Sequence, residues 1–144
     1  MNRTTLYATL IGALLVSAAA LGIGAAADSP RSLMSPSDYS QSKRAIEAEK
    51  RLALARCRLL DGLSKDLCKA QARAEERIQK ADLEARYRGT VGAAAEARLA
   101  RAKAQYDIAK TKCGDLRGDE KSACLQSARE EKTRALAEAK LAST

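Results

Sequence analysis

Four cysteines are the residues of this sequence whose type and spacing could do chemistry. They form two sets with the same internal spacing, Cys57 with Cys68 and Cys113 with Cys124. Four cysteines allow three disulfide pairings, and pairing within each set closes a short loop at a helix-turn-helix corner. A thioredoxin-type redox site needs two cysteines one helical turn apart, which this spacing does not offer. A zinc site needs four converging ligands, and the absence of histidine makes that alternative weaker, so we predict two local disulfides and no metal.

The two cysteine sets belong to an internal repeat. An offset of 56 residues superposes Cys57 on Cys113, and it also superposes several neighbours, namely Leu60 on Leu116, Gly62 on Gly118, Lys65 on Lys121 and Cys68 on Cys124. The part of the chain that contains the cysteines is therefore predicted to be an internal duplication of one unit, in which the cysteines occupy equivalent positions.

The elements that would position these cysteines are helices, because alanine, leucine, lysine, arginine, glutamate and glutamine dominate the chain and β-branched residues are few. We predict four helices, over residues 38–61, 65–88, 93–117 and 120–142. Gly62 and Gly118 are the predicted turn residues that end the first and third helices, because glycine accepts the left-handed conformation. Ser37, Ser64 and Asp119 are the predicted N-caps.

Apolar residues recur at heptad spacing in these helices, but alanine fills many of the positions. The first helix has Tyr39, Ile46, Ala53, Cys57 and Leu60. The second has Leu67, Gln71, Ala74, Ile78, Ala81 and Ala85. The third has Ala95, Leu99, Ala102, Tyr106, Ala109, Cys113 and Leu116. These seams favour packing within each of two antiparallel αα-hairpins, and they leave open whether the hairpins form a four-helix bundle or an elongated, coiled-coil-like pair.

The remaining helix faces carry acid-first charge pairs four residues apart, which stabilise a helix locally. The pairs are Glu47–Arg51, Glu76–Lys80, Asp82–Arg86, Glu84–Arg88 and Glu130–Arg134. We therefore interpret these charges as structural rather than as a binding code.

Residues 1–27 are predicted to be a secretory signal peptide. Arg3 supplies the positive start, an uncharged apolar run follows, and Ala25 and Ala27 place small residues before a cleavage point at Asp28. The apolar run is also long enough to span a bilayer, which takes about 20 residues, so an uncleaved N-terminal anchor is the alternative. Both locations place the protein outside the cytoplasm, in the periplasm.

The rest of the chain divides at its prolines and glycines. Residues 28–36 hold both prolines and are predicted to be a flexible lead-in. The first αα-hairpin is predicted over 37–88, a glycine-containing linker over 89–92 and the second hairpin over 93–144.

Composition argues against catalysis. The chain has no histidine, no glycine-rich phosphate loop and no expected free thiol, so we expect neither an enzyme nor a cofactor nor a small-molecule substrate. The net charge of +8 favours anionic partners. Export removes the usual nucleic-acid targets, so we expect no nucleic acid and regard anionic lipid as the relevant class.

The sequence resembles a group of exported, Ala/Lys-rich twin-cysteine helical proteins of Gram-negative bacteria, some labelled as cell-envelope biogenesis proteins by likeness to a Tol-type stalk. The residues that carry the resemblance are Asp38, Tyr39, Ile46, Glu47, Ala48, Cys57, Leu60, Gly62, Lys65, Asp66, Cys68, Ala72, Leu83, Glu84, Ala85, Arg86, Tyr87, Tyr106, Ala109, Lys110, Lys112, Cys113, Gly118, Lys121 and Cys124. The turns depart from the group, which commonly has Gly-Asn-Ala-Lys-Asp and a proline between its halves. The resemblance implies an exported helical protein and supplies no catalytic residue.

We therefore expect a non-enzymatic periplasmic protein that serves as a structural, scaffold or stress-protective component of the cell envelope. Its partner would be an envelope protein or a second copy of the chain, held through the alanine-rich seams. The alternative is a basic membrane-surface binder of anionic lipid or lipopolysaccharide.

Overall fold

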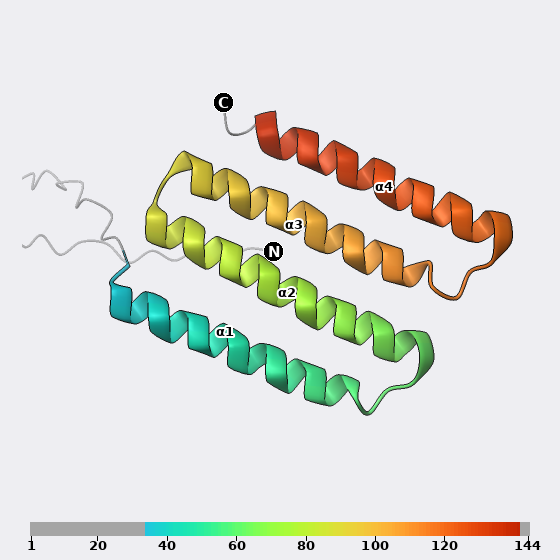
Figure 1. Ribbon diagram of the computed structural model, residues 1–144, viewed down its shortest axis with the longest axis horizontal. Coiled ribbons are helices and arrows are strands. Elements are labelled where there is room, and N and C mark those ends of the chain that lie inside the picture. The colour runs from blue at the N-terminus through green and yellow to red at the C-terminus, as the bar shows by residue number, and fades with distance from the viewer. Residues whose placement is uncertain (1–33, 142–144) are drawn as a thin grey trace, which may run out of the picture. The chain divides into compact units, whose positions relative to one another are not determined.

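The computed structural model describes residues 34–141, which lie within one compact unit of the chain. In this part of the chain the regular elements are all α-helices (Figure 1). They are α1 (Pro36–Cys57), α2 (Gly62–Arg88), α3 (Val91–Lys112) and α4 (Gly118–Leu141). The predicted all-α fold of two stapled hairpins is confirmed. The leader, with its predicted cleavage residues Ala25, Ala27 and Asp28, lies outside the described residues.

The first helix begins earlier than predicted. Ser35 is the N-cap of α1, and its Oγ accepts a hydrogen bond from the Asp38 backbone N–H at 3.1 Å. Pro36 takes the first helical position, where a backbone N–H would have no helical partner anyway. The predicted cap, Ser37, therefore lies inside the first turn, and Pro36, the last residue of the predicted lead-in, belongs to the helix.

The helices also end before the glycines that were predicted to stop them. Beyond Cys57 the chain tightens, because the N–H groups of Arg58, Leu59 and Leu60 each bond to the carbonyl three residues earlier. α2 then begins at Gly62 with Asp61 at its N-cap position. The other predicted caps are also wrong: Ser64 lies inside α2, and Asp119 lies in the first turn of α4.

The connection between the hairpins is shorter than the predicted linker 89–92. Gly89, at φ 63°, ends α2 in the left-handed conformation, and its N–H bonds to the Ala85 carbonyl. The Thr90 Oγ1 then accepts from the Ala93 N–H at 3.1 Å and caps α3. Val91 and Gly92 are therefore helical, and this two-residue connection returns α3 antiparallel to α2.

The four helices pack in a row in chain order (Figure 1). Among the described helices, α1 packs against α2, α2 against α3 and α3 against α4, whereas α1 and α4 do not meet. The two hairpins thus lie side by side as an open, up-and-down bundle, not end to end. The interface between α2 and α3, which joins the hairpins, is the most extensive of the three. This corrects the expectation that packing would be strongest within each hairpin.

The core is built mainly of alanine, so helix backbones approach closely and little apolar area is buried. Leu83, Cys57 and Cys113 are the largest fully buried side chains. The other buried residues are Ile46, Ala72, Ala74, Ala93, Ala97, Ala102, Ala104, Ala128 and Ala139. The predicted seams miss Leu83, but they contain the buried residues Ile46, Cys57, Ala74, Ala102 and Cys113. A single heptad seam describes one contact face, whereas α2 and α3 each have a neighbour on two sides.

Ion pairs clamp the first three helices together. Of the predicted pairs within one helix, Glu76–Lys80 and Glu84–Arg88 form, at 2.9 and 4.0 Å. Several other charges instead reach a neighbouring helix, in the pairs Lys50–Glu76, Glu47–Lys80, Arg77–Asp107, Asp82–Arg101 and Arg88–Glu96. More of these charged residues therefore form ion pairs between helices than the periodic pattern predicted.

Candidate functional site

Both predicted disulfides are present. Cys57 bonds to Cys68 with their Cα atoms 5.5 Å apart, and Cys113 bonds to Cys124 with their Cα atoms 5.9 Å apart. Each joins the end of one helix to the second turn of the next, so it pins a hairpin at its corner. No cysteine in the part that the structure describes is free. Two structural disulfides indicate an oxidising, extracytoplasmic compartment.

Gly62 and Gly118 occupy equivalent places in the two corners. Both have φ +54°, the left-handed region that side chains other than glycine rarely adopt. A Cβ at either position would meet nothing within 4 Å, so conformation and not space accounts for the glycine. The sequence therefore identified the glycines of both turns, but each begins the second helix of its hairpin and does not end the first.

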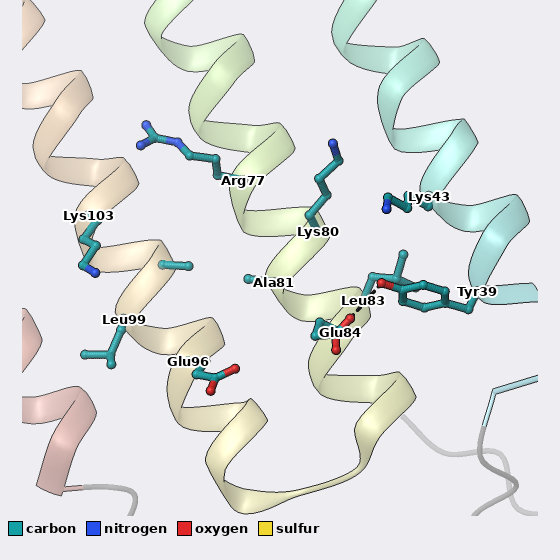
Figure 2. A pocket seen from close by; sticks show the side chains of 11 residues that line it. Tyr39, Lys43, Arg77, Lys80, Ala81, Leu83, Glu84, Glu96, Leu99 and Lys103 are labelled. Carbon is teal, nitrogen blue, oxygen red and sulfur yellow. Dashed lines mark hydrogen bonds between the residues drawn. The ribbon is translucent and has the colours of Figure 1, made fainter. Parts of the chain in front are cut away.

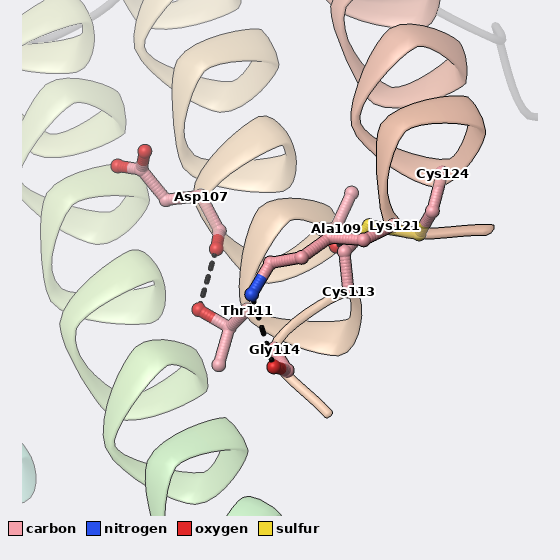
Figure 3. Close-up of a disulfide and its surroundings, with 7 residues drawn as sticks. All are labelled: Asp107, Ala109, Thr111, Cys113, Gly114, Lys121 and Cys124. Atoms are coloured by element: carbon pink, nitrogen blue, oxygen red, sulfur yellow. Dashed lines mark hydrogen bonds between the residues drawn. A yellow bond between two sulfur atoms is a disulfide. The ribbon is translucent and has the colours of Figure 1, made fainter. Parts of the chain in front are cut away.

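The second corner is held by local contacts as well as by its disulfide (Figure 3). The Lys121 Nζ donates to the Gly114 carbonyl at 3.3 Å. A Cβ at Gly114 would lie 2.9 Å from the Thr111 carbonyl oxygen and 3.6 Å from the Leu63 Cδ1. Because Leu63 belongs to the first corner, the two stapled corners are neighbours at the same end of the row.

The first corner exposes two adjacent leucines that sequence reasoning misplaced. The Leu59 side chain is 84% exposed, and Leu60, which was predicted to lie on the helical seam, is 40% exposed. α1 ends at Cys57, so the periodic pattern no longer applies to the next residues. Arg56 and Arg58 precede these leucines in the chain and are exposed too.

A groove of about 590 Å³ crosses one face of the row (Figure 2). Its apolar part is formed by Ala81 and Leu83 of α2 and by Leu99 and Ala100 of α3. The remaining lining residues are polar or aromatic, namely Tyr39, Lys43, Arg77, Lys80, Glu84, Glu96 and Lys103. Four cations against two carboxylates give the lining a positive balance.

Most of the groove's charges are already paired. The Lys80 Nζ donates to Glu76 at 2.9 Å and to Glu47 at 3.2 Å, and these acceptors raise the pKa of the Lys80 ammonium. Arg77 pairs with Asp107 at 2.7 Å. Within the described part of the chain, Lys43 and Lys103 take part in no ion pair, so these two exposed ammonium groups are the cations that an incoming anion would meet first.

The tyrosine at one end of the groove is held from two sides. The Tyr39 hydroxyl donates to Glu84 at 2.8 Å, and the ring lies 4.4 Å, centroid to centroid, from the Tyr87 ring. Donation to the carboxylate raises the pKa of the Tyr39 phenol. This tyrosine therefore stays protonated and ties the start of α1 to the end of α2, which the heptad pattern did not indicate.

A second groove, of about 790 Å³, lies on the other face of α2 and α3. α2 contributes Gln79, Asp82 and Arg86 to it, which helical geometry places opposite the residues of the first groove. Because the helices form a single row, both faces of the two inner helices reach the surface.

Residues 34–141 contain no group of three or more histidine, cysteine or acidic side chains placed to hold a metal ion. In the same range, no helix is long and apolar enough to cross a bilayer.

Comparison of the chain with protein-family models, with curated proteins and with solved structures gave no match.

Proposed function

We propose that this chain is a non-enzymatic periplasmic protein that serves as a structural or scaffold component of the cell envelope. The observation that carries the proposal is the open row: two stapled hairpins side by side, with a groove on each face of the inner helices. Such a row presents surface to a partner on both faces, and the staples keep its hairpin corners closed in an oxidising compartment.

The partner that best fits the first groove is an envelope protein with an acidic, partly apolar segment. Lys43 and Lys103 stand at the groove's edges, and the half-buried Ala81 and Leu99 provide apolar contact between them. The likeness to exported Ala/Lys-rich helical proteins supports the same location. A stress-protective role belongs to the same proposal, because a stapled helical protein resists unfolding.

Site-specific photo-crosslinking in living cells tests this role. A photoreactive amino acid replaces Lys43 in one variant and Lys103 in another, and a matched control carries it at the exposed Arg134 of α4. We expect the same envelope protein to be captured from both groove positions and not from Arg134. If both groove positions capture no envelope protein, or if all three give the same background pattern, the scaffold proposal is wrong.

The alternative function is a basic membrane-surface binder of anionic lipid or lipopolysaccharide. The formal charge of +8 favours it, and the charge falls only to +7 if Arg3 is removed with the leader. Attraction of this kind is screened by ions, so it predicts vesicle binding that weakens as salt is raised.

A further inference from the structure

We infer that the stapled end of the row docks on the anionic surface of a phospholipid bilayer through the first corner. We call this surface the corner tip and define it by Arg56, Arg58, Leu59 and Leu60. The inference gives the membrane alternative a defined place on the molecule, and it does not depend on the scaffold role of the grooves.

The apolar part of the corner tip is exposed in the described chain, and Leu59 is more exposed than Leu60. Leu59 is 84% exposed and Leu60 is 40% exposed, although Leu83, a residue of the same type, is buried to 1% exposure in the core. Single exposed leucines are ordinary on protein surfaces. Two in succession, in a turn at the end of a helical row, give an apolar projection that can enter a lipid headgroup layer.

The charges around this apolar projection match an anionic surface. Arg56 and Arg58 are exposed, and neither forms an ion pair within residues 34–141. The one acid in the turn, Asp61, is offset by Lys65, whose Nζ lies 3.7 Å from its carboxylate. Exposed apolar residues beside guanidinium groups favour interfacial binding, because the leucines can enter the headgroup layer while the arginines contact phosphates.

The corner is also held rigidly enough to present this surface. The disulfide from Cys57 to Cys68 closes the turn at its base, and Leu63 supports it by lying against Gly114 of the second corner. A turn fixed in this way loses little conformational freedom when it binds, which favours binding by a small surface.

Vesicle flotation of the exported chain tests the inference, with phosphatidylglycerol-containing vesicles compared with vesicles of phosphatidylcholine alone. We expect the wild type to float with the anionic vesicles at low salt. The double variant Leu59→Ser/Leu60→Ser should bind on the order of tenfold more weakly, since each leucine loses its burial in the headgroup layer. The matched apolar control is Leu52→Ser on α1, which is 60% exposed but lies away from the corner, and it should bind like the wild type.

The charge contribution is tested with an equal change in net charge at two places. Arg56→Gln/Arg58→Gln should weaken binding to anionic vesicles, while Arg44→Gln/Arg51→Gln, at exposed positions along α1, should weaken it less. All variants keep the same N-terminus, read by intact mass, so the leader cannot account for a difference. As a measurement on the wild type itself, hydrogen exchange of residues 58–63 should slow when anionic vesicles are added.

Three outcomes would overturn the inference. Wild-type chain that fails to float with anionic vesicles at low salt excludes this docking surface and leaves the scaffold proposal untouched. If the two double-arginine variants lose vesicle binding equally, the vesicles respond to the overall charge of the protein and not to the corner tip. A wild-type dimer that becomes monomeric in Leu59→Ser/Leu60→Ser, without vesicle binding, shows that a second copy of the chain covers the leucines instead.

Discussion

At the residue scale, Glu76 shows how a helix-surface carboxylate becomes part of an inter-helix clamp. Its Oε2 lies 2.6 Å from the Lys50 Nζ of α1, and its Oε1 lies 2.9 Å from the Lys80 Nζ of its own helix. Two hydrogen bonds lower the pKa of the Glu76 carboxyl below its ordinary value of 4.5, and the one from Lys50 has a larger effect than the one from Lys80. This pair of contacts predicts a pH dependence of stability.

A carboxyl whose pKa is lower in the folded chain than in the unfolded chain stabilises the fold at pH values above its unfolded-state pKa. This contribution is lost as the pH falls through the carboxyl's folded-state pKa. We therefore expect Glu76→Gln to be less stable than the wild type at pH 7, with the difference shrinking as the pH falls below about 4.5. Urea unfolding at pH 7 and at a pH below about 4.5 measures this difference in stability. The control is Glu49→Gln, on the exposed side of α1. A deficit in Glu76→Gln that is unchanged in acid would contradict the role of the ion pairs.

At the scale of elements, the two stapled corners have equal disulfide loops but unequal support. Both disulfides join residues 11 apart, so their chain-entropy contributions should be alike, at about 3 kcal/mol each. α1 is additionally tied to α2 by the Lys50–Glu76 pair and by the Tyr39 contacts. α3 and α4 are joined by a cation–π contact, in which the Lys132 Nζ lies 4.1 Å from the Tyr106 ring centroid.

Removing each staple should therefore loosen a different helix to a different degree. In Cys113→Ala/Cys124→Ala we expect the amides of α4 to lose more hydrogen-exchange protection than the amides of α1 lose in Cys57→Ala/Cys68→Ala. The free energy of global unfolding should be lower by roughly 3 kcal/mol in each variant than in the wild type. Faster exchange in α1 than in α4 would mean that the ion pairs and the Tyr39 contacts contribute little.

At the scale of the whole molecule, the open row distinguishes this protein from a closed four-helix bundle. Packed helices lie roughly 8–10 Å apart, so the outer helices of a four-helix row are separated by about three such spacings. Within residues 34–141, α1 and α4 then each keep one long side free, and α2 and α3 each expose two faces. Surface of this extent suits a protein that binds along its length more than one that encloses a small ligand.

Intramolecular cross-linking of lysines tests the row directly. A short lysine-reactive reagent should join α1 to α2, α2 to α3 and α3 to α4, as in a link from Lys50 to a lysine of α2. It should not join Lys43 or Lys50 of α1 to Lys132 or Lys140 of α4 within one chain. Mass spectrometry of isotope-mixed samples separates links within a chain from links between chains, and abundant α1–α4 links within one chain would indicate a closed bundle.

The sequence by itself determined the helical class, the number of helices, the cysteine pairing and the glycine turns. These follow from local causes, because composition sets helix propensity and the repeated spacing of Cys57 and Cys68 in Cys113 and Cys124 leaves few pairings that a short turn can close. Helix ends were less well predicted, since the tight turns after Cys57 and the cap at Ser35 depend on backbone hydrogen bonds that periodicity does not encode.

Only the tertiary structure decided how the two hairpins meet and which residues that meeting buries or exposes. The connection at Gly89 and Thr90 reverses the chain, α2 packs along α3, and Leu83 becomes buried although no predicted seam contains it. Alanine-rich faces are too alike to specify one neighbour, so the choice comes from the turn geometry and from charge pairs between helices, such as Asp82 with Arg101. Because the sequence does not specify which helices are neighbours, the grooves and the exposure of Leu59 could be identified only from the packed structure.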